Sequence, residues 1–261
     1  MITAASNSRI KRLVQLNQKS KLRRTEDVFL AEGVKMFLEA PREQLQEVYV
    51  SESFLEKCSC REHLEEVGYE VVSDSVFSKI SDTCTPQGVL CVLKQFHYNI
   101  EEMLRDKAPL FLLLENIQGP GNLGTMLRTG EGAGVSGIIM SRDTVDLYNP
   151  KVIRSTMGSI YRVPFYYADD FAAAVHQVQQ TGVSVYAAHL RGKNSYACQD
   201  YTKGTAFLIG NEGNGLREET AELADCYIRI PMEGKVESLN AAVASSILMY
   251  EAHRQRATIE K

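Results

Sequence analysis

A glycine-rich stretch is the first part of the sequence whose residues indicate chemistry. Residues 109–134 read PLFLLLENIQGPGNLGTMLRTGEGAG, and Gly119, Gly121 and Gly124 have the G-x-G-x-x-G spacing of dinucleotide-binding loops. Four residues nevertheless separate the apolar run from the first glycine, and Pro120 removes an N–H group from a loop that should present N–H groups to pyrophosphate. An oxidoreductase that binds NAD or FAD is therefore a weak hypothesis for this loop.

The helix predicted after this loop carries two polar side chains of interest. Its apolar residues recur with a period of about 3.6 residues and share a face that would pack on a sheet. Arg128 lies off that face, one turn after Gly124, and Asn122 stands where a helix cap is wanted. The alternative interpretation is an ordinary cap with a surface pair between Arg128 and Glu131. This segment alone does not separate the two.

Two further loops have a similar setting. AFLIGNEGNGL, at residues 206–216, predicts a strand that runs into a glycine-rich loop with one carboxylate, Glu212. Residues 226–254 predict a strand, a loop that begins at a proline, and a final helix that Ser238 would cap. Each loop follows the carboxyl end of a predicted strand, where open parallel sheets bind ligands. We expect the three loops to converge on one crevice.

Taken together, these segments resemble the motifs of the SpoU (TrmH-like) family of RNA 2′-O-ribose methyltransferases, in the SPOUT superfamily. NIQGPGNLGTMLRTGEGAGV is similar to the first motif, LIGNEGNGL to the second and IPMEGKVESLNAAVA to the third. FLAEGVKMFLEA and TPQGVLCVL resemble the small substrate-binding domain, related to a ribosomal-protein fold, that many members carry. Gly119 and Asn116 depart from the family by standing where aspartate is common.

The resemblance implies S-adenosylmethionine as cofactor, no metal, and a trefoil knot in the C-terminal domain. It also implies a homodimer formed through the knot region and the final helix, whose small residues Ala241, Ala244, Ser245 and Ser246 would suit either close helix packing or an ordinary core. The residues assigned to cofactor binding are Gly210, Gly213, Ile230, Met232 and Leu239. Those assigned to catalysis are Asn122, Arg128, Glu212, Ser238 and Asn240.

The role of Arg128 is set by its chemistry. A family arginine is often described as the base that deprotonates the ribose hydroxyl, but an arginine pKa above about 12 opposes deprotonation at neutral pH. We therefore expect Arg128 to stabilise the developing alkoxide, alone or with an RNA phosphate. The other four catalytic residues would orient Arg128 and hold the ribose.

The elements that must position these residues form two α/β halves. Residues 1–94 are predicted to hold a basic arm and the substrate-binding domain, residues 95–108 a linker, and residues 109–261 the methyltransferase domain. Alternating strands and helices in the second half favour a mostly parallel sheet covered on both faces. The strands are expected at 27–33, 46–51, 69–73 and 88–94, and then at 110–115, 136–140, 183–188, 205–210 and 226–230.

The charge of the chain is unevenly distributed. The whole chain carries a net charge of −4, but residues 1–25 contain seven basic residues and no acidic one, which leaves −11 on the remainder. A basic end on an acidic body is typical of nucleic-acid binding, although a solvated helix face or a transit peptide has the same composition. With the resemblance in view, RNA is the expected partner of Arg9, Lys11, Arg12, Lys19, Lys21, Arg23 and Arg24.

Composition limits the remaining possibilities. Six scattered cysteines without a C-x-x-C pair indicate reduced thiols, and the absence of a membrane span or a secretory signal favours the cytoplasm. Cys58, Cys60 and His63 have a loosely metal-like spacing, but a structural zinc site needs four ligands. The family resemblance, and not composition, implies methylation of ribosomal RNA, with 23S favoured, and leaves a transfer-RNA methyltransferase or a non-catalytic RNA-binding relative as alternatives.

Overall fold

The structure, a computed structural model, describes residues 1–259 and divides the chain into two compact units. Unit 1 contains residues 1–96 and 146–161, and unit 2 contains residues 97–145 and 162 onward. The chain therefore passes between the units three times, and the predicted linker at 95–108 coincides with only the first passage.

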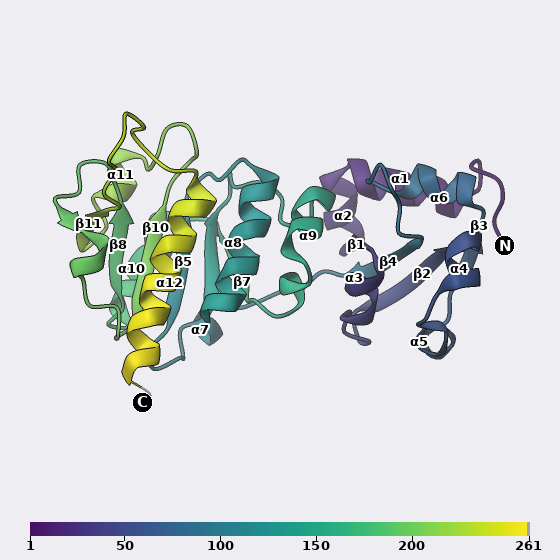
Figure 1. The fold of residues 1–261 in the computed structure, drawn as a ribbon, viewed down its shortest axis with the longest axis horizontal. Coiled ribbons are helices and arrows are strands. Elements are labelled where there is room, and N and C mark those ends of the chain that lie inside the picture. The colour runs from purple at the N-terminus through teal and green to yellow at the C-terminus, as the bar shows by residue number, and fades with distance from the viewer. Residues whose placement is uncertain (260–261) are drawn as a thin grey trace. The chain divides into compact units, whose positions relative to one another are not determined.

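Unit 1 is built on a four-stranded sheet of order β1-β4-β2-β3, in which only β2 and β3 run parallel (Figure 1). All four strands were predicted from the sequence. They are β1 (Val28–Glu32), β2 (Leu45–Ser51), β3 (Glu70–Val72) and β4 (Val89–Lys94). The helices are α1 (Ser8–Gln18), α2 (Ser20–Glu26), α3 (Val34–Leu38), α4 (Glu52–Lys57), α5 (Arg61–Val67), α6 (Asp74–Ile80) and α9 (Pro150–Thr156).

The basic N-terminal residues form part of this folded unit. Helix α1 buries Ile10, Leu13 and Leu16 against the hydrophobic core of the sheet and α6, because these residues share one face of the helix. The side chain of Asn7 caps α1 by accepting a hydrogen bond from the Arg9 N–H at 2.9 Å. The interpretation as a helix with a solvated basic face therefore describes these residues better than an extended arm does.

Residues 146–161 complete the core of unit 1 from a distant part of the sequence. The ring of Tyr148 packs on Phe29 of β1 with centroids 4.8 Å apart, and its hydroxyl hydrogen-bonds both the N–H and the carbonyl of Phe96. The Tyr161 hydroxyl donates to the carbonyl of Met36 at 3.0 Å. This segment was not predicted to belong to the first domain.

Unit 2 contains a seven-stranded sheet of order β7-β6-β5-β10-β8-β11-β9, all of whose pairings are parallel. This confirms the predicted parallel α/β fold, although the short strands β7 and β9 were not predicted. The strands are β5 (Leu110–Leu114), β6 (Gly137–Ser141), β7 (Phe165–Ala168), β8 (Ser184–Ala188), β9 (Asn194–Ser195), β10 (Thr205–Ile209) and β11 (Cys226–Arg229).

Helices cover both faces of this sheet. In Figure 1, α8 (Pro120–Ala133) and α12 (Ala241–Ile259) lie side by side in front of the strands, and α10 (Phe171–Gln180) lies behind them. Two short helices, α7 (Ile100–Met103) and α11 (Glu218–Ala221), contribute buried residues to the same core cluster as α10. Every residue of β5, β6 and β10 is buried, as expected for strands covered on both sides. No described helix is both long and apolar enough to cross a membrane.

Candidate functional site

The loop after β5 is shaped by one unusual residue. Asn116 adopts the left-handed backbone conformation, with φ of 53°, which asparagine tolerates better than most residues. Its N–H donates to the Ser141 hydroxyl at 2.8 Å and its carbonyl accepts from the Asn211 amide, also at 2.8 Å. Asn116 thus ties the loop after β5 to the last residue of β6 and to the loop after β10.

Asn211 also folds its own loop. Its side-chain oxygen accepts from the N–H groups of Gly213 at 2.9 Å and Asn214 at 3.1 Å, and its backbone pairs with Gly215 in both directions. The loop closes so tightly on Gly210 that a Cβ atom there would lie 2.2 Å from the backbone of Gly215 and Leu216. Glycine is therefore required at position 210 by steric contact.

Three predicted catalytic residues form one hydrogen-bonded cluster. The Asn240 amide donates to the Asn122 side-chain oxygen at 3.0 Å, and the Asn122 amide donates to Glu212 at 2.8 Å. The Glu212 carboxylate also accepts the N–H groups of Gly119 at 2.7 Å and Gln118 at 3.0 Å. This cluster joins the three loops, as the sequence predicted.

The Glu212 carboxylate is held in its ionised form. Partial burial raises its pKa, but the hydrogen bonds from Asn122 and from the backbone of Gln118 and Gly119 more than offset this, and the net pKa lies below the usual 4.5. A carboxylate that accepts three N–H groups can fix the start of α8 without a change of charge near neutral pH.

Two helix-start predictions were wrong in detail. Helix α8 begins at Pro120, so Asn122 lies within its first turn and does not cap it. Proline suits this position because its missing N–H would have no partner in the helix. The final helix is capped by Asn240, which accepts from the N–H groups of Ala242 at 2.9 Å and Val243 at 3.3 Å, and not by Ser238.

Arg128 lies on the solvent-exposed side of α8, off the buried face, as predicted. Glu131, its alternative partner, pairs instead with Arg162. Within residues 1–259, no hydrogen bond or ion pair to Arg128 is found. The structure therefore does not join Arg128 to the Glu212 cluster, and its guanidinium is available to a ligand.

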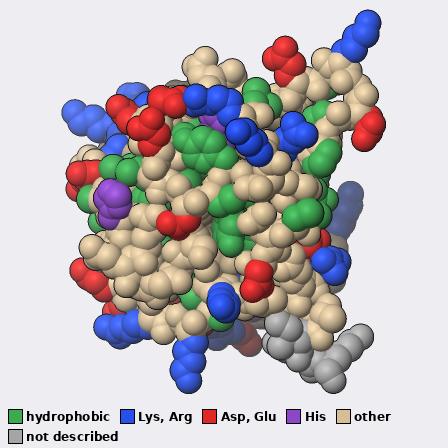
Figure 2. Space-filling model, turned by 90° about the vertical axis from the view of Figure 1, so that its left-hand side faces the viewer, with side chains coloured by type: hydrophobic (Ala, Val, Ile, Leu, Met, Phe, Trp, Pro, Cys, Tyr) green, Lys and Arg blue, Asp and Glu red, His purple; other side chains and the backbone are tan. Residues whose placement is uncertain are grey.

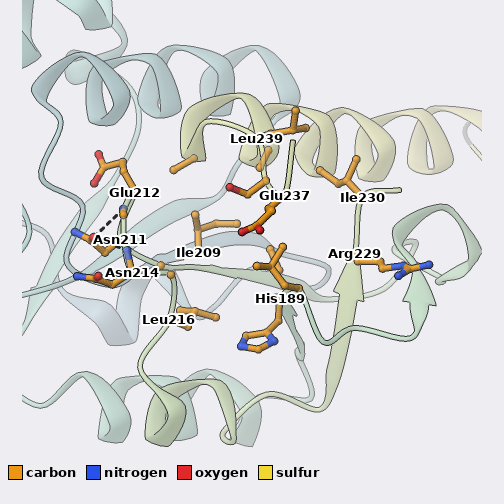
Figure 3. Close-up of a pocket in the computed structure, with 18 of the residues that line it drawn as sticks. His189, Ile209, Asn211, Glu212, Asn214, Leu216, Arg229, Ile230, Glu237 and Leu239 are labelled. Carbon is orange, nitrogen blue, oxygen red and sulfur yellow. Dashed lines mark hydrogen bonds between the residues drawn. The ribbon is translucent and has the colours of Figure 1, made fainter. Parts of the chain in front are cut away.

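A cavity of about 260 Å³ opens beside the cluster, at the carboxyl ends of β8, β10 and β11. All five residues assigned to cofactor binding line it, together with Glu212 and Ser238. In Figure 3, Ile209, Ile230 and Leu239 surround the cavity while Leu216 and His189 lie below it. The five residues assigned to cofactor binding are Gly210, Gly213, Ile230, Met232 and Leu239.

The wall contributed by β8 and the segment after it was not predicted from the sequence. Ala188, His189 and Leu190 line the cavity because β8 lies between β10 and β11 in the sheet. Burial, and then the nearby Arg191, lower the pKa of His189, whose Nδ1 accepts the Arg191 N–H at 3.1 Å. The available signal was the carboxyl end of a third parallel strand, but only the strand order places it beside the other two.

Comparison with known proteins assigns these features to a family. A family model described as "SpoU rRNA Methylase family" matches residues 109–250, more than half of the chain. This chain belongs to that family. A second model, the "MRM3-like substrate binding domain", matches residues 7–91 of this SpoU methylase. The family predicted from the three motifs is confirmed.

Individual relatives extend along nearly the whole SpoU methylase. It is 32% identical to the 23S rRNA (guanosine(2553)-2′-O)-methyltransferase RlmP of Bacillus subtilis, over 95% of this chain and 97% of that protein. An AdoMet-bound rRNA methyltransferase from Sinorhizobium meliloti is 30% identical with a TM-score of 0.83, covering 97% of each chain. AviRb from Streptomyces viridochromogenes, in complex with AdoMet, is 25% identical with a TM-score of 0.87, covering 97% of this chain and 99% of its own.

The cavity fits the cofactor of the family, S-adenosylmethionine. Its walls combine apolar side chains, which suit an adenine ring, with backbone of the loop at residues 210–216. Because Gly210 has no side chain, this loop can close tightly on itself. Glu237 adds a carboxylate to the wall, whereas the guanidinium of Arg229 points away from the cavity in Figure 3. The family model, the rRNA methyltransferase relatives and the AdoMet-bound structures confirm the predicted cofactor and the RNA methyltransferase activity of the SpoU methylase.

The seven basic residues predicted to bind RNA differ in their surroundings in unit 1. Five are exposed, although one of these, Arg9, lies near Glu70, and the half-buried Arg12 pairs with Glu26 and Glu47. Arg23 is only 3% exposed and binds Leu16 O, Asn17 O and Asp146, so its assignment to RNA was wrong. The exposed five are Arg9, Lys11, Lys19, Lys21 and Arg24.

Proposed function

We propose that this protein transfers a methyl group from S-adenosylmethionine to the 2′-hydroxyl of a ribose in 23S ribosomal RNA. The observation that carries the proposal is the cluster of Glu212, Asn122 and Asn240, which closes three loops beside the cofactor cavity. RlmP, which is similar over the whole length, is named for this reaction on a guanosine of 23S rRNA. We assign no nucleotide.

The bound cofactor would supply an activated methyl group on a sulfonium. The chain itself would supply position and charge: the Asn122–Glu212–Asn240 cluster fixes the start of α8, from which Arg128 projects toward solvent. When the ribose hydroxyl gives up its proton to water or to an RNA phosphate on methylation, the Arg128 guanidinium would stabilise the negative charge that develops on the ribose oxygen. Ser238, exposed on the cavity wall, would hold the ribose.

We further propose that unit 1 grips the RNA through the exposed basic residues of α1 and α2, and that the protein works in the cytoplasm. Helices α1 and α2 lie within the part matched by the substrate-binding model. A transfer RNA is the alternative substrate, and a non-catalytic RNA binder is the alternative function.

We also propose a trefoil knot and a homodimer. The final helix offers a surface for the dimer because Val243 and Tyr250, one heptad apart, are 48% and 49% exposed. Of the four small residues that suggested helix approach, Ala241 and Ser245 are buried in the chain's own core, and Ala244 and Ser246 are half-buried. Figure 2 shows hydrophobic side chains in the middle of the face of unit 2 that carries β11, with charged side chains toward the rim.

The test is methyl transfer into RNA from a strain in which the gene is deleted. Wild-type protein and tritiated S-adenosylmethionine should label 23S rRNA from that strain and leave 23S rRNA from the parent unlabelled. Labelling of transfer RNA alone would show that transfer RNA, and not 23S rRNA, is the substrate. Binding of RNA without any transfer would favour the non-catalytic alternative.

A further inference from the structure

The buried Arg23 and the half-buried Asp146 form an ion pair at one passage of the chain between the units. The Arg23 guanidinium donates to the Asp146 carboxylate at 2.5 Å and to Leu16 O at 2.5 Å, and its side chain is 3% exposed. The other Asp146 oxygen accepts the Tyr148 N–H at 3.1 Å. Asp146 is thus fixed both to α2 and to the segment that follows it.

Val145, the residue immediately before Asp146, belongs to unit 2 and is held there from both sides. Its N–H donates to the carbonyl of Ile117 at 2.8 Å, and its own carbonyl accepts the Tyr167 hydroxyl at 2.6 Å. A single peptide bond therefore connects a residue anchored to α2 with a residue anchored to the loop after β5.

Ile117 is fully buried and directly precedes the two residues that bind Glu212 through their backbone. Gln118 strengthens the connection, because its side chain donates to the Asp143 carbonyl at 2.6 Å, in the loop that leads to Val145. A shift of the backbone at Val145 would therefore move the N–H groups that orient Glu212, and with them Asn122.

At the other end, Arg23 is surrounded in sequence by exposed basic residues. Lys21 and Arg24 project from α2 on either side of it, and Lys19 precedes the helix. We propose that Asp146, held by Arg23, is a positioning residue through which RNA bound to α2 sets the loop after β5 for methyl transfer. The inference rests on the proposed function for its substrate.

The variant that tests this role is Asp146→Asn, which keeps the acceptor for the Tyr148 N–H and removes the charge that Arg23 binds. We expect kcat on 23S rRNA to fall about tenfold, within the range of typical coupling between linked sites. KM for RNA and the Kd for S-adenosylmethionine should stay unchanged. The matched control is Asp82→Asn, which weakens the Arg154–Asp82 pair in the same unit, away from the passage.

A second readout does not require catalysis. We expect binding of 23S rRNA to slow hydrogen exchange of the Val145 amide in the wild type and in Asp82→Asn, but not in Asp146→Asn. An unchanged kcat, or an exchange response equal to the wild type in Asp146→Asn, would overturn the proposal. Equal losses of kcat, cofactor affinity and thermal stability in that variant would also overturn it, since they indicate a structural role. If the wild type binds RNA without methylating it, the proposed function fails while the exchange experiment still tests the coupling.

Discussion

Arg128 is exposed on α8, and the Asn122–Glu212–Asn240 cluster fixes the start of the same helix. Because no described residue binds its guanidinium, Arg128→Ala should leave folding and cofactor affinity unchanged. We expect the methylation barrier to rise by about 3 kcal/mol, as on removal of a preorganised electrostatic group. Single-turnover methyl transfer into 23S rRNA, with calorimetry of cofactor binding, measures both quantities.

Arg128→Lys should recover only part of the rate, because a point charge does not reproduce a planar, forked donor. The control is Arg142→Ala, which removes another exposed arginine of unit 2 that pairs with Asp169. Equal rates for wild type and Arg128→Ala would remove Arg128 from the mechanism.

Glu212 predicts a pH dependence of stability with a definite sign. Its pKa in the folded protein lies below 4.5, so its hydrogen bonds stabilise the fold fully above that value and are lost as the pH falls through the folded pKa. We expect the melting temperature of wild type and Glu212→Gln to differ most above about pH 5 and to converge in acid. Melting curves from pH 3 to pH 7 test this, and a constant difference would contradict it.

The sequence predicted the positions of single residues correctly where the order of strands and loops allows a side chain only one location. The approach of Asn122, Glu212 and Asn240 followed from three loops at one edge of a parallel sheet. The cap of the final helix did not, because Ser238 and Asn240 are both good caps and lie two residues apart. The burial of Arg23 also could not be foreseen, since its partner Asp146 is more than one hundred residues away.

At the scale of elements, the loop after β10 predicts different outcomes for two neighbouring glycines. Gly210→Ala would place a methyl group 2.2 Å from the backbone of Gly215, so the loop must open and cofactor binding should be lost. Gly213→Ala meets its nearest protein atom at 3.6 Å, an ordinary van der Waals distance, so the loop should stay closed and cofactor affinity should fall far less than in Gly210→Ala. Calorimetry with S-adenosylmethionine on the two variants tests this, and equal affinities would contradict it.

The end of α12 is fastened by one arginine. Arg256 donates to the carbonyls of Ala108, Pro109, Tyr201 and Lys203, which precede β5 and β10, at 2.7–3.1 Å. We expect Arg256→Met to lower the free energy of unfolding by about 2 kcal/mol, since these carbonyls lose a charged donor. Arg254→Met, which removes an exposed pair with Glu251, should cost less than about 0.5 kcal/mol. Urea unfolding measures both, and equal losses would contradict the assignment.

Elements were predictable where hydrophobic periodicity was long. The buried strands β5 and β10 and the alternating pattern of unit 2 were recognised, whereas β7 and β9, with four and two residues, carry too little pattern. Residues 51–68 have one helical pattern but form two helices, α4 and α5, because residues 58–60 leave the helical conformation. The strand order cannot be obtained from periodicity, since β10 pairs with β5 across ninety residues of intervening chain.

At the scale of the whole molecule, RNA affinity should depend on the exposed basic residues of unit 1. Changing Lys19, Lys21 and Arg24 to glutamine should weaken RNA binding and reduce its salt dependence by about one unit of slope for each phosphate that is no longer neutralised. Cofactor affinity should not change. The control is Lys57→Gln with Lys79→Gln, exposed lysines elsewhere in unit 1. An unchanged salt dependence of RNA binding would indicate that these residues form ordinary solvated surface and do not contact RNA.

The core shared between Phe29, Phe96, Tyr148 and Tyr161 limits how this protein can change by recombination. A crossover that exchanged only the first ninety-six codons would set a foreign β1 against the original α9 and its aromatic neighbours. A successful exchange also needs one crossover before codon 146 and another after codon 161, so that residues 146–161 are exchanged together with residues 1–96. The two parts of unit 1 are therefore expected to be inherited together, although about fifty codons separate them, and a fragment that ends at residue 96 should expose an incomplete core.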